Sequence, residues 1–522
     1  MPISLDQTQN SQGGTRLLDK QAYTFDKKRL LLLFWLAVAL LLVAAVIMRL
    51  YHLNAPFDRD SYDEGVYWQS LRAMLAGLPL YHTIFYSQPP AFLLVTFPGF
   101  ALFGGSLWAA RFSIALVSLL GFAGAYVMGK SLAGRLGVLA ALLLLLMDPF
   151  YLQESQIIQA EASSEAFTLL AIGFALLWWR QPDGRRGICW AVLSGVTLAL
   201  SIFCKLLCVS TVVPIAMLML ARVWQIWNRR PGTGSRSWLP ILAGVGAALV
   251  VSLLLVLPFL GSFQVFWSSV ITFHQVAGKV SPSSVSHSFM VKSTLITLSG
   301  LLACYGTLAA LLRRDWRVLP LLAWLLVTFI LLWLQKPLFF HHLIALEPPL
   351  IALVVLGVAE PASYKRALSK VNLEALAPFV TVLAFFLVLI AAAVNFQQDL
   401  HAYQFTDTTS ASASVQKDLQ VANDLRQAIA PNQWVITDGQ FVAGLADRST
   451  PPSLVDTSGV RIATGYVTLA QLEQAAADPR VHAVLFYTGR FSQSSVAAFH
   501  SWVARHFHLL HSYGKGQELW VR

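Results

Sequence analysis

Charged residues are scarce in this chain of 522 residues: Asp, Glu, Lys and Arg make up 12% of it, whereas 56% of its residues are hydrophobic. A soluble protein would carry about twice that charged fraction. The mean hydropathy of +0.62 agrees with this shortage of charge. The composition therefore excludes a wholly soluble protein.

Cysteine and several familiar signatures are also scarce or missing. The four cysteines lie in apolar segments, and Cys204 and Cys208 have helical spacing without an accompanying Cys or His pair. Packing is therefore favoured over a metal site for these cysteines. The chain has no internal repeat of the transporter kind and no basic surface studded with aromatic residues, which argues against binding to nucleic acid.

Apolar runs of about 20 residues, the length that spans a bilayer, recur along the chain. They predict an α-helical polytopic membrane protein with about eleven transmembrane helices. The first run is not followed by a small-residue cleavage site, so we expect a retained anchor. The polar residues 1–29 before it are expected to form a disordered cytoplasmic tail. The expected helices cover residues 30–50, 91–104 joined to 107–128, 134–150, 162–179, 188–203, 207–224, 238–259, 293–312, 318–335, 343–359 and 376–395.

Lys and Arg alternate between the loops and predict an orientation. Every second loop is basic, as in Arg185-Arg186, Arg229-Arg230 and Arg313-Arg314, whereas the loops between them hold mostly isolated cations. Loops rich in Lys and Arg stay in the cytoplasm. We therefore expect a multi-pass protein of the plasma membrane with a cytoplasmic N-terminus, and a net charge of +11 that anchors it to the inner leaflet.

Beyond residue 396 the composition becomes more polar and the apolar runs shorten. Alternating helical and strand-like patterns predict a small C-terminal α/β extracytoplasmic domain over residues 396–522. It has no glycine-rich phosphate motif and no nucleophile motif, so we expect an accessory domain that contacts an acceptor. The patterns predict helices over 414–430, 469–477 and 494–507, and strands over 433–437, 481–487 and 518–521.

The polar residues of the expected membrane domain, residues 30–395, gather in its outside loops. The first of these loops, residues 54–90, carries the adjacent acids Asp63-Glu64. Charged groups cost roughly 2.5 to 3.5 kcal/mol each at a helix centre, so acids kept at this edge are candidates for binding or proton transfer. A solvated acidic loop is the simpler alternative. The same loop also holds Arg72, Tyr81, His82, Tyr86 and Gln88.

Further acids and cations lie in the other outside loops, among them Glu161, Lys205, His341 and His342. Each has an ordinary explanation: Lys205 at a span end could extend its ammonium to the interface, the two histidines could be interfacial anchors, and Glu161 could be a helix-start acid. Together they fit transfer of a group from a phosphorylated lipid. A base deprotonates the acceptor hydroxyl, and cations offset the charge on the leaving phosphate.

The pattern resembles the polytopic glycosyltransferases that use polyprenyl-phosphate sugars, including protein O-mannosyltransferases and lipid A aminoarabinose transferases. Asp63-Glu64-Gly65-Val66-Tyr67 resembles the Asp-Glu-x-x-Tyr motif of the family, and Gln88-Pro89-Pro90 resembles its Pro-Pro motif, where many relatives have Lys before the prolines. Glu161, Lys205 and His341-His342 fall where the family has its second acidic motif and outer cations. The resemblance covers about residues 30–395.

This resemblance implies a GT-C type fold and an inverting transfer on the outer face. It implies that Asp63 is the catalytic base, that Glu64 and Glu161 orient acceptor or sugar hydroxyls, and that Lys205 and one of the two histidines contact the lipid phosphate. The further binding residues it implies are Tyr67, Tyr81, His82 and Gln88. The expected partners are a polyprenyl-phosphate-linked sugar, an acceptor protein, glycan or glycolipid, and membrane lipids.

No cofactor is expected, because the donor arrives in the membrane and needs no nucleotide-sugar site. Carboxylates could hold a hard cation, but the nearby cations already offer neutralisation of the phosphate, so we favour a reaction without metal. The acids considered for such an ion are Asp60, Asp63, Glu64 and Glu161. A lipid or solute transporter is the alternative function, and a scaffold or receptor that works through its tail is a third.

Overall fold

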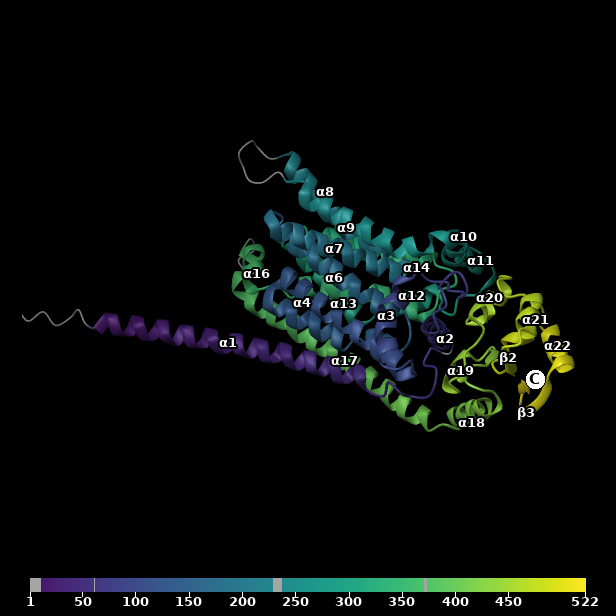
Figure 1. Ribbon diagram of the computed structural model, residues 1–522. Helices are drawn as coiled ribbons and strands as arrows, with labels where there is room; N and C mark the ends of the chain where they lie inside the picture. The colour runs from purple at the N-terminus through teal and green to yellow at the C-terminus, as the bar shows by residue number, and fades with distance from the viewer. Residues whose placement is uncertain (1–10, 61, 229–236, 370–372) are drawn as a thin grey trace, which may run out of the picture.

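The computed structural model describes residues 11–60, 62–228, 237–369 and 373–522, and they form a helical bundle with a smaller domain at one end (Figure 1). Within these residues, eight helical segments are long and apolar enough to cross a membrane, or nine if a bent pair is counted as one span. The eight are α1 (Ser11–Leu50), α4 (Leu107–Leu146), α6 (Glu161–Arg180), α7 (Gly184–Cys204), η1 (Leu206–Thr211) with α8 (Val212–Trp227), α9 (Leu239–Val256) with η2 (Leu257–Ser262), α10 (Phe263–Trp267), η3 (Ser268–Thr272) and α11 (Phe273–Val280), η4 (Phe340–Leu346) with α15 (Glu347–Gly357), and η6 (Glu374–Leu376) with α17 (Ala377–Ser410).

The prediction of a polytopic helical membrane protein is confirmed, but the expected eleven spans correspond only approximately to separate helices. The bent pair is α12 and α13, which meet at 64°. Another expected span, α14, has 17 residues. The remaining helices of the membrane domain are α2 (Asp63–Leu75), α3 (Ala91–Leu102), α5 (Pro149–Glu154), α12 (His287–Leu295), α13 (Leu298–Leu312), α14 (Val318–Leu334) and α16 (Pro361–Leu368).

Helix α4 is a hairpin of two helices rather than one long span. Its backbone leaves the helical region at Ala133 and Gly134, and Gly134 has a φ of 64°. A Cβ built on Gly129 would lie 2.3 Å from the carbonyl oxygen of Gly137. Eight residues rise about 12 Å along a straight helix, so this contact requires the chain to reverse. The two expected spans 107–128 and 134–150 are therefore antiparallel arms.

The basic loops meet at one end of the bundle. The guanidinium of Arg180 donates to the carbonyl of Lys130, and that of Arg317 donates to the carbonyl of Ser131, both in the α4 hairpin turn. In Figure 1 the opposite end carries the C-terminal domain and helices α2, α10, α11 and α12. The alternation of basic and acidic loops in the sequence thus corresponds to two ends of the bundle.

The C-terminal domain is a sheet with helices on both faces. The strand order is β1-β2-β4-β3, with β1 parallel to β2 and the other pairs antiparallel. Successive residues of β2 face opposite cores: Leu485 belongs to the core that contains Leu425 of α18, and Val484 to the core that contains Phe499 of α22. The elements are α18 (Ala413–Ala428), β1 (Trp434–Thr437), α19 (Gln440–Leu445), η7 (Pro452–Leu454), α20 (Gly459–Ala463), α21 (Leu469–Ala477), β2 (Val481–Phe486), η8 (Arg490–Ser492), α22 (Ala498–His506), β3 (His508–Gly514) and β4 (Gln517–Val521).

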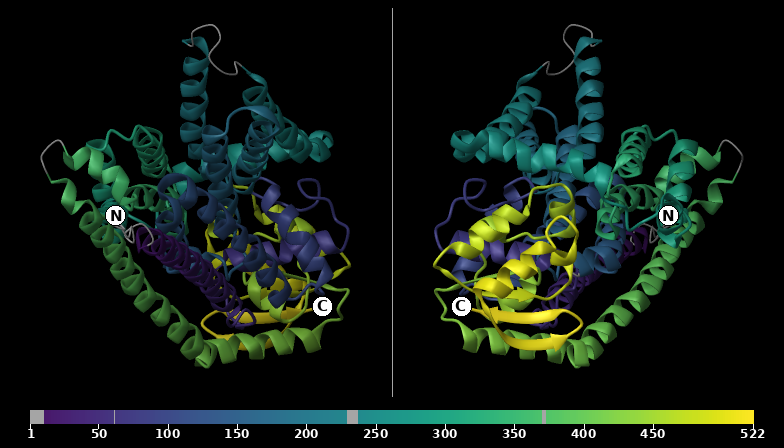
Figure 2. Two further views of the ribbon diagram at one scale, coloured as in Figure 1. Left: turned by 90° about the vertical axis from the view of Figure 1, so that its left-hand side faces the viewer. Right: turned by 90° about the vertical axis from the view of Figure 1, so that its right-hand side faces the viewer.

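The boundaries at both ends of the membrane domain differ from the expected ones. Helix α1 begins at Ser11, within the tail expected to be disordered, and residues 1–10 lie outside the described residues. Helix α17 runs for 34 residues without a break and passes the expected boundary at residue 396 before α18 begins. Figure 2 shows α17 descending along the flank of the bundle to α18, with the strands above it. The two domains are thus joined by continuous helix.

Candidate active site

The two adjacent acids Asp63 and Glu64 begin helix α2 but have different surroundings. The side chain of Glu64 has no exposed surface and forms a two-point ion pair with Arg111 of α4. The Nε–Oε1 and Nη2–Oε2 distances are both 2.6 Å. The remaining lone pairs accept from the backbone N–H groups of Arg59 and Ile158. The carboxylate of Glu64 is therefore fully engaged with the protein itself.

Arg111 extends the effect of this pair to the start of the loop. Its guanidinium donates to the backbone carbonyls of Leu53, Ala55 and Phe57 at 2.9 to 3.0 Å. A charged donor is needed there, because buried carbonyls without partners are costly. The contacts of Glu64 therefore fit a positioning residue that fixes the loop, and they leave no room for the expected contact with acceptor or sugar hydroxyls.

Asp63 is only half-buried by its exposed surface, and its environment is rich in charge. Burial of the carboxyl group raises the pKa of Asp63 to about 7, and the neighbouring carboxylates of Asp60 and Asp456 act in the same direction, whereas His341 opposes them. A pKa near neutrality suits a general base. Asp63 thus has the accessibility that Glu64 lacks, together with a pKa that suits a base.

A chain of charged side chains lies beside Asp63. The Nζ of Lys205, which follows α7, is bonded to Oε1 of Glu161, the first residue of α6. The same Glu161 oxygen lies 3.6 Å from Nε2 of His341, whose Nδ1 lies 3.4 Å from Oδ1 of Asp60. Four segments distant in sequence therefore form one line of alternating acid and base. The local reason is that α6, η1, and η4 all begin at this end of the bundle.

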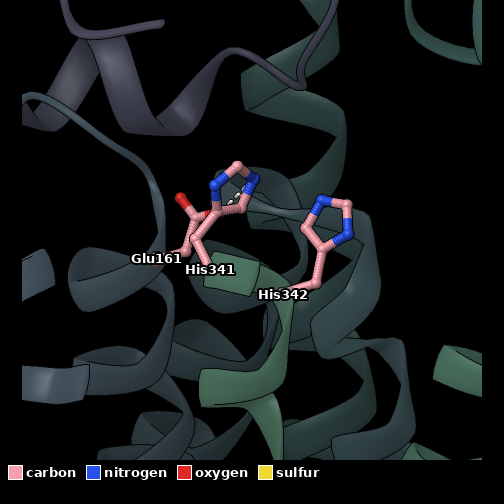
Figure 3. Close-up of side chains that lie close together, drawn as sticks. All are labelled: Glu161, His341 and His342. Atoms are coloured by element: carbon pink, nitrogen blue, oxygen red, sulfur yellow. Dashed lines mark ion pairs between the residues drawn. The ribbon is translucent and has the colours of Figure 1, made fainter. Parts of the chain in front are cut away.

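His342 completes a compact group with two members of this chain. Figure 3 shows the carboxylate of Glu161 against the His341 ring, with His342 beside them on the same short helix η4. One ligand atom from each of the three residues lies within 4.8 Å of the others. Nδ1 of His342 accepts from the backbone N–H of Phe339, which leaves Nε2 for a ligand. A carboxylate and two imidazoles are a donor set that could hold a transition-metal ion.

The other four predicted site residues, Tyr67, Tyr81, His82 and Gln88, differ in their surroundings. Tyr67 is buried one turn after Asp63, with its ring edge-on to Tyr86 and Phe92. The hydroxyl of Tyr81 donates to the backbone carbonyl of Gln88 at 2.5 Å and thereby closes its own loop. His82 is exposed, and no hydrogen bond or ion pair joins its side chain to the rest of the described chain. The side chains of Tyr81 and His82 thus have no contact with the charged chain at Asp63.

Sequence reasoning missed the roles of two residues. Arg111 is absent from the expected site, although it is the single charged residue between residues 107 and 129. A lone charge in an apolar segment signals a buried partner, and that signal was available. Asp456 gave no comparable signal, because it lies in the C-terminal domain, almost 400 positions from Asp63.

The fold and the site define a class: a polytopic membrane protein whose charged site lies at one end of a helical bundle, next to an extramembrane domain. The comparisons agree with this class. Residues 87–262 match the sequence model of the family described as dolichyl-phosphate-mannose-protein mannosyltransferase. No curated protein matches the sequence closely enough to be counted as a relative.

Solved structures show the same fold over nearly the whole chain. The crystal structure of ArnT from Cupriavidus metallidurans bound to undecaprenyl phosphate is 16% identical, with a TM-score of 0.63 over 94% of this chain and 97% of that one. ArnT in the apo state is 15% identical, with a TM-score of 0.63 over 95% and 98% of the two chains. The chain therefore has the GT-C fold of ArnT. Together with the family match, this confirms the predicted resemblance to polyprenyl-phosphate-dependent glycosyltransferases.

Proposed function

We propose that this protein is an inverting glycosyltransferase that moves a sugar from a polyprenyl-phosphate donor to an acceptor hydroxyl. The observation that carries the proposal is the juxtaposition of Asp63 with the chain formed by Asp60, His341, Glu161 and Lys205. A base and a set of cations at one membrane edge are what this transfer requires. ArnT, which has the same fold, binds undecaprenyl phosphate, and this supports a lipid-phosphate donor.

In the proposed reaction Asp63 accepts the proton of the acceptor hydroxyl. The acceptor oxygen forms a bond to the anomeric carbon as the bond between that carbon and the phosphate oxygen breaks. The electron pair of the broken bond leaves with the polyprenyl phosphate. Because the nucleophile attacks from the side opposite the phosphate, the anomeric configuration is inverted. The carboxyl of Asp63 releases its proton to solvent afterwards.

Lys205 and His341 supply the cations for the leaving phosphate in this proposal. The Lys205 side chain is only 11% exposed, so its charge needs a partner in the absence of donor, and Glu161 provides it. A buried charge without a partner is strongly unfavourable. Glu161 thus holds both Lys205 and His341 at the place where the phosphate would arrive, and the hydroxyl of Tyr67 lies near Asp63 and Glu161.

The orientation follows from the two ends of the bundle. The end with Arg180, Arg317 and the α4 hairpin turn is basic, and basic loops remain in the cytoplasm. The site and the C-terminal domain then lie on the outer face of the plasma membrane, where the acceptor is a protein, a glycan or a glycolipid. No metal is required in this proposal, although Glu161, His341 and His342 form a group that could hold one.

The test is transfer by the purified protein in lipid, with radiolabelled mannosyl and aminoarabinosyl polyprenyl phosphates as donors and either water or a membrane extract as acceptor. Wild type should release the lipid phosphate, and Asp63→Asn should keep its fold and lose the release. Full activity of Asp63→Asn would overturn the assignment of the base. No turnover of any donor by folded wild type would favour the transporter hypothesis, which flux measurements would then test.

A further inference from the structure

Helix α2, which presents Asp63, has no local device that fixes its start. Its N-cap residue is Tyr62, and no side chain caps the first turn. Helix starts are usually fixed by Ser, Thr, Asp or Asn, whose side chains accept from the free N–H groups. Asp63 favours the helix through its dipole, and Glu64 ties the first turn to Arg111 and to the N–H of Arg59, but neither holds the N-cap residue Tyr62. Its position must therefore come from tertiary contacts.

The C-terminal domain provides such a contact through Tyr62. The hydroxyl of Tyr62 accepts from the backbone N–H of Thr457 at 2.8 Å and lies 3.0 Å from Oγ1 of Thr457. Thr457 donates its own hydroxyl proton to the carbonyl of Thr437, so Oγ1 acts as the acceptor for Tyr62. The guanidinium of Arg490 lies over the Tyr62 ring, 3.8 Å from its centre. The side chain before Asp63 is thus held by three groups of the other domain.

The residues after Asp63 contact the same domain closely. A Cβ built on Gly65 would lie 2.5 Å from the backbone nitrogen of Phe441, so only glycine allows α2 to lie against α19. One turn further, the amide of Gln69 donates to the carbonyl of Arg448 at 3.0 Å. The C-terminal domain therefore contacts α2 on both sides of Asp63, through Tyr62 and through Gly65.

We propose that Thr457 is a positioning residue that holds Asp63 in its reactive place through the Tyr62 hydroxyl, so that the C-terminal domain is a part of the active site rather than an accessory. This inference rests on the proposed function and deepens it. It assigns to Tyr62 and Thr457 a role in the rate of transfer. Neither residue belongs to the charged chain with Lys205 and His341, where the donor phosphate is proposed to bind.

A second tyrosine between the two domains offers a matched control. The hydroxyl of Tyr466 lies 2.9 Å from Oγ of Ser268 in η3, so it also joins the C-terminal domain to the membrane domain. It does not contact α2. Tyr62→Phe and Tyr466→Phe each remove one interdomain hydroxyl and keep the ring. If domain attachment alone mattered, the two variants would behave alike.

The experiment compares wild type, Tyr62→Phe, Tyr466→Phe, Thr457→Val and Thr457→Ser in the donor-release assay over a range of pH. We expect Tyr62→Phe and Thr457→Val to lower kcat by about 10-fold, because small displacements of a catalytic group are costly, with the KM for donor unchanged. Their pH–rate profiles should also differ from that of wild type, because a displaced Asp63 would change its burial and its distances to Asp60, His341, Asp456 and Glu161, which set its pKa. Tyr466→Phe and Thr457→Ser should match wild type.

Two outcomes would overturn the inference: equal effects of Tyr62→Phe and Tyr466→Phe, or a Tyr62→Phe variant with wild-type kcat and pH profile. Either result would leave the proposed function intact, provided that wild type turns over and Asp63→Asn does not. An inactive wild type would instead refute the proposed function. Thermal unfolding of each variant shows whether a loss of kcat reflects a loss of fold, and Thr457→Ser tests the hydroxyl independently of Tyr62.

Discussion

The adjacent acids Asp63 and Glu64 should respond in opposite ways to the loss of their charge. Glu64→Gln leaves the guanidinium of Arg111 buried without a counter-ion, and both side chains have 0% exposure. Removing one partner of a buried pair costs about 3 to 5 kcal/mol. The new amide nitrogen would also face an N–H donor, from Arg111 or from the backbone of Arg59 or Ile158.

Thermal unfolding in lipid nanodiscs measures this difference. Glu64→Gln should lower the Tm by several degrees, whereas Asp63→Asn should keep or raise it at pH 8, because a half-buried carboxylate beside other carboxylates is replaced by a neutral group. Asp447→Asn is the matched control: it breaks the ion pair between Arg72 of the same helix α2 and Asp447 of the C-terminal domain, but the Asp447 side chain is 69% exposed. Exposed pairs contribute less than about 1 kcal/mol.

The double variant Glu64→Gln with Arg111→Met tests whether the loss of stability comes from breaking the ion pair. Residues in direct contact show non-additive effects, so the double variant should lose much less stability than the sum of the two single variants. A Glu64→Gln protein with wild-type Tm and no transfer would refute the reasoning. It would mean that Glu64 acts on the substrate and that its contact with Arg111 is incidental.

Four further predictions concern the site. If Asp63 is the base, kcat/KM should rise with pH through about 7 and level off above it, because burial raises the pKa of Asp63 to about 7; Asp456→Asn should shift this rise to lower pH in the same pH-rate measurement, and a profile flat from pH 5 to 9 would exclude Asp63. Lys205→Ala should raise the apparent donor constant, and an unchanged constant would remove Lys205 from the phosphate site. Gly65→Ala should separate α2 from α19, since its Cβ would lie 2.5 Å from the nitrogen of Phe441. Protease sensitivity of the C-terminal domain measures this separation. Gly77→Ala is the control: its Cβ meets no atom within 4 Å, so it tests only the strain of a positive φ. Treatment with EDTA should leave transfer unchanged, and a loss restored by Zn²⁺ or Mn²⁺ would assign a metal to Glu161, His341 and His342.

The sequence correctly predicted the helices and strands whose formation depends on residues close to them in the chain. The helix over 469–477 and the strand over 481–487 match α21 and β2 within one residue, because their apolar periodicity is decided by neighbours along the chain. Strand β3 was missed because nearly all of its residues are exposed and show no buried alternation. The basic loops likewise predicted one end of the bundle, since charge decides sidedness without reference to tertiary packing.

Within the candidate site, the type of residue was predictable and the partner was not. The sequence marked Glu161, Lys205 and His341 as outer charges, and the structure places all three in one chain. Only the family resemblance separated Asp63 from Glu64; the residues alone could not, because the distinction depends on Arg111, which is 47 positions away from Glu64. Roles that depend on a distant partner require the packed fold.

The contact between Tyr62 and Thr457 joins residues 395 positions apart. Contacts of such separation form late, because the intervening chain must first be made and folded. The loop with Asp63 is therefore synthesised almost 400 residues before the group that contacts its Tyr62. Chains that lack the C-terminal domain would therefore form the helices of the membrane domain while Tyr62, next to Asp63, lacked its contact with Thr457. If Asp63 is the base, synthesis of the C-terminal domain is then the step that completes the active site.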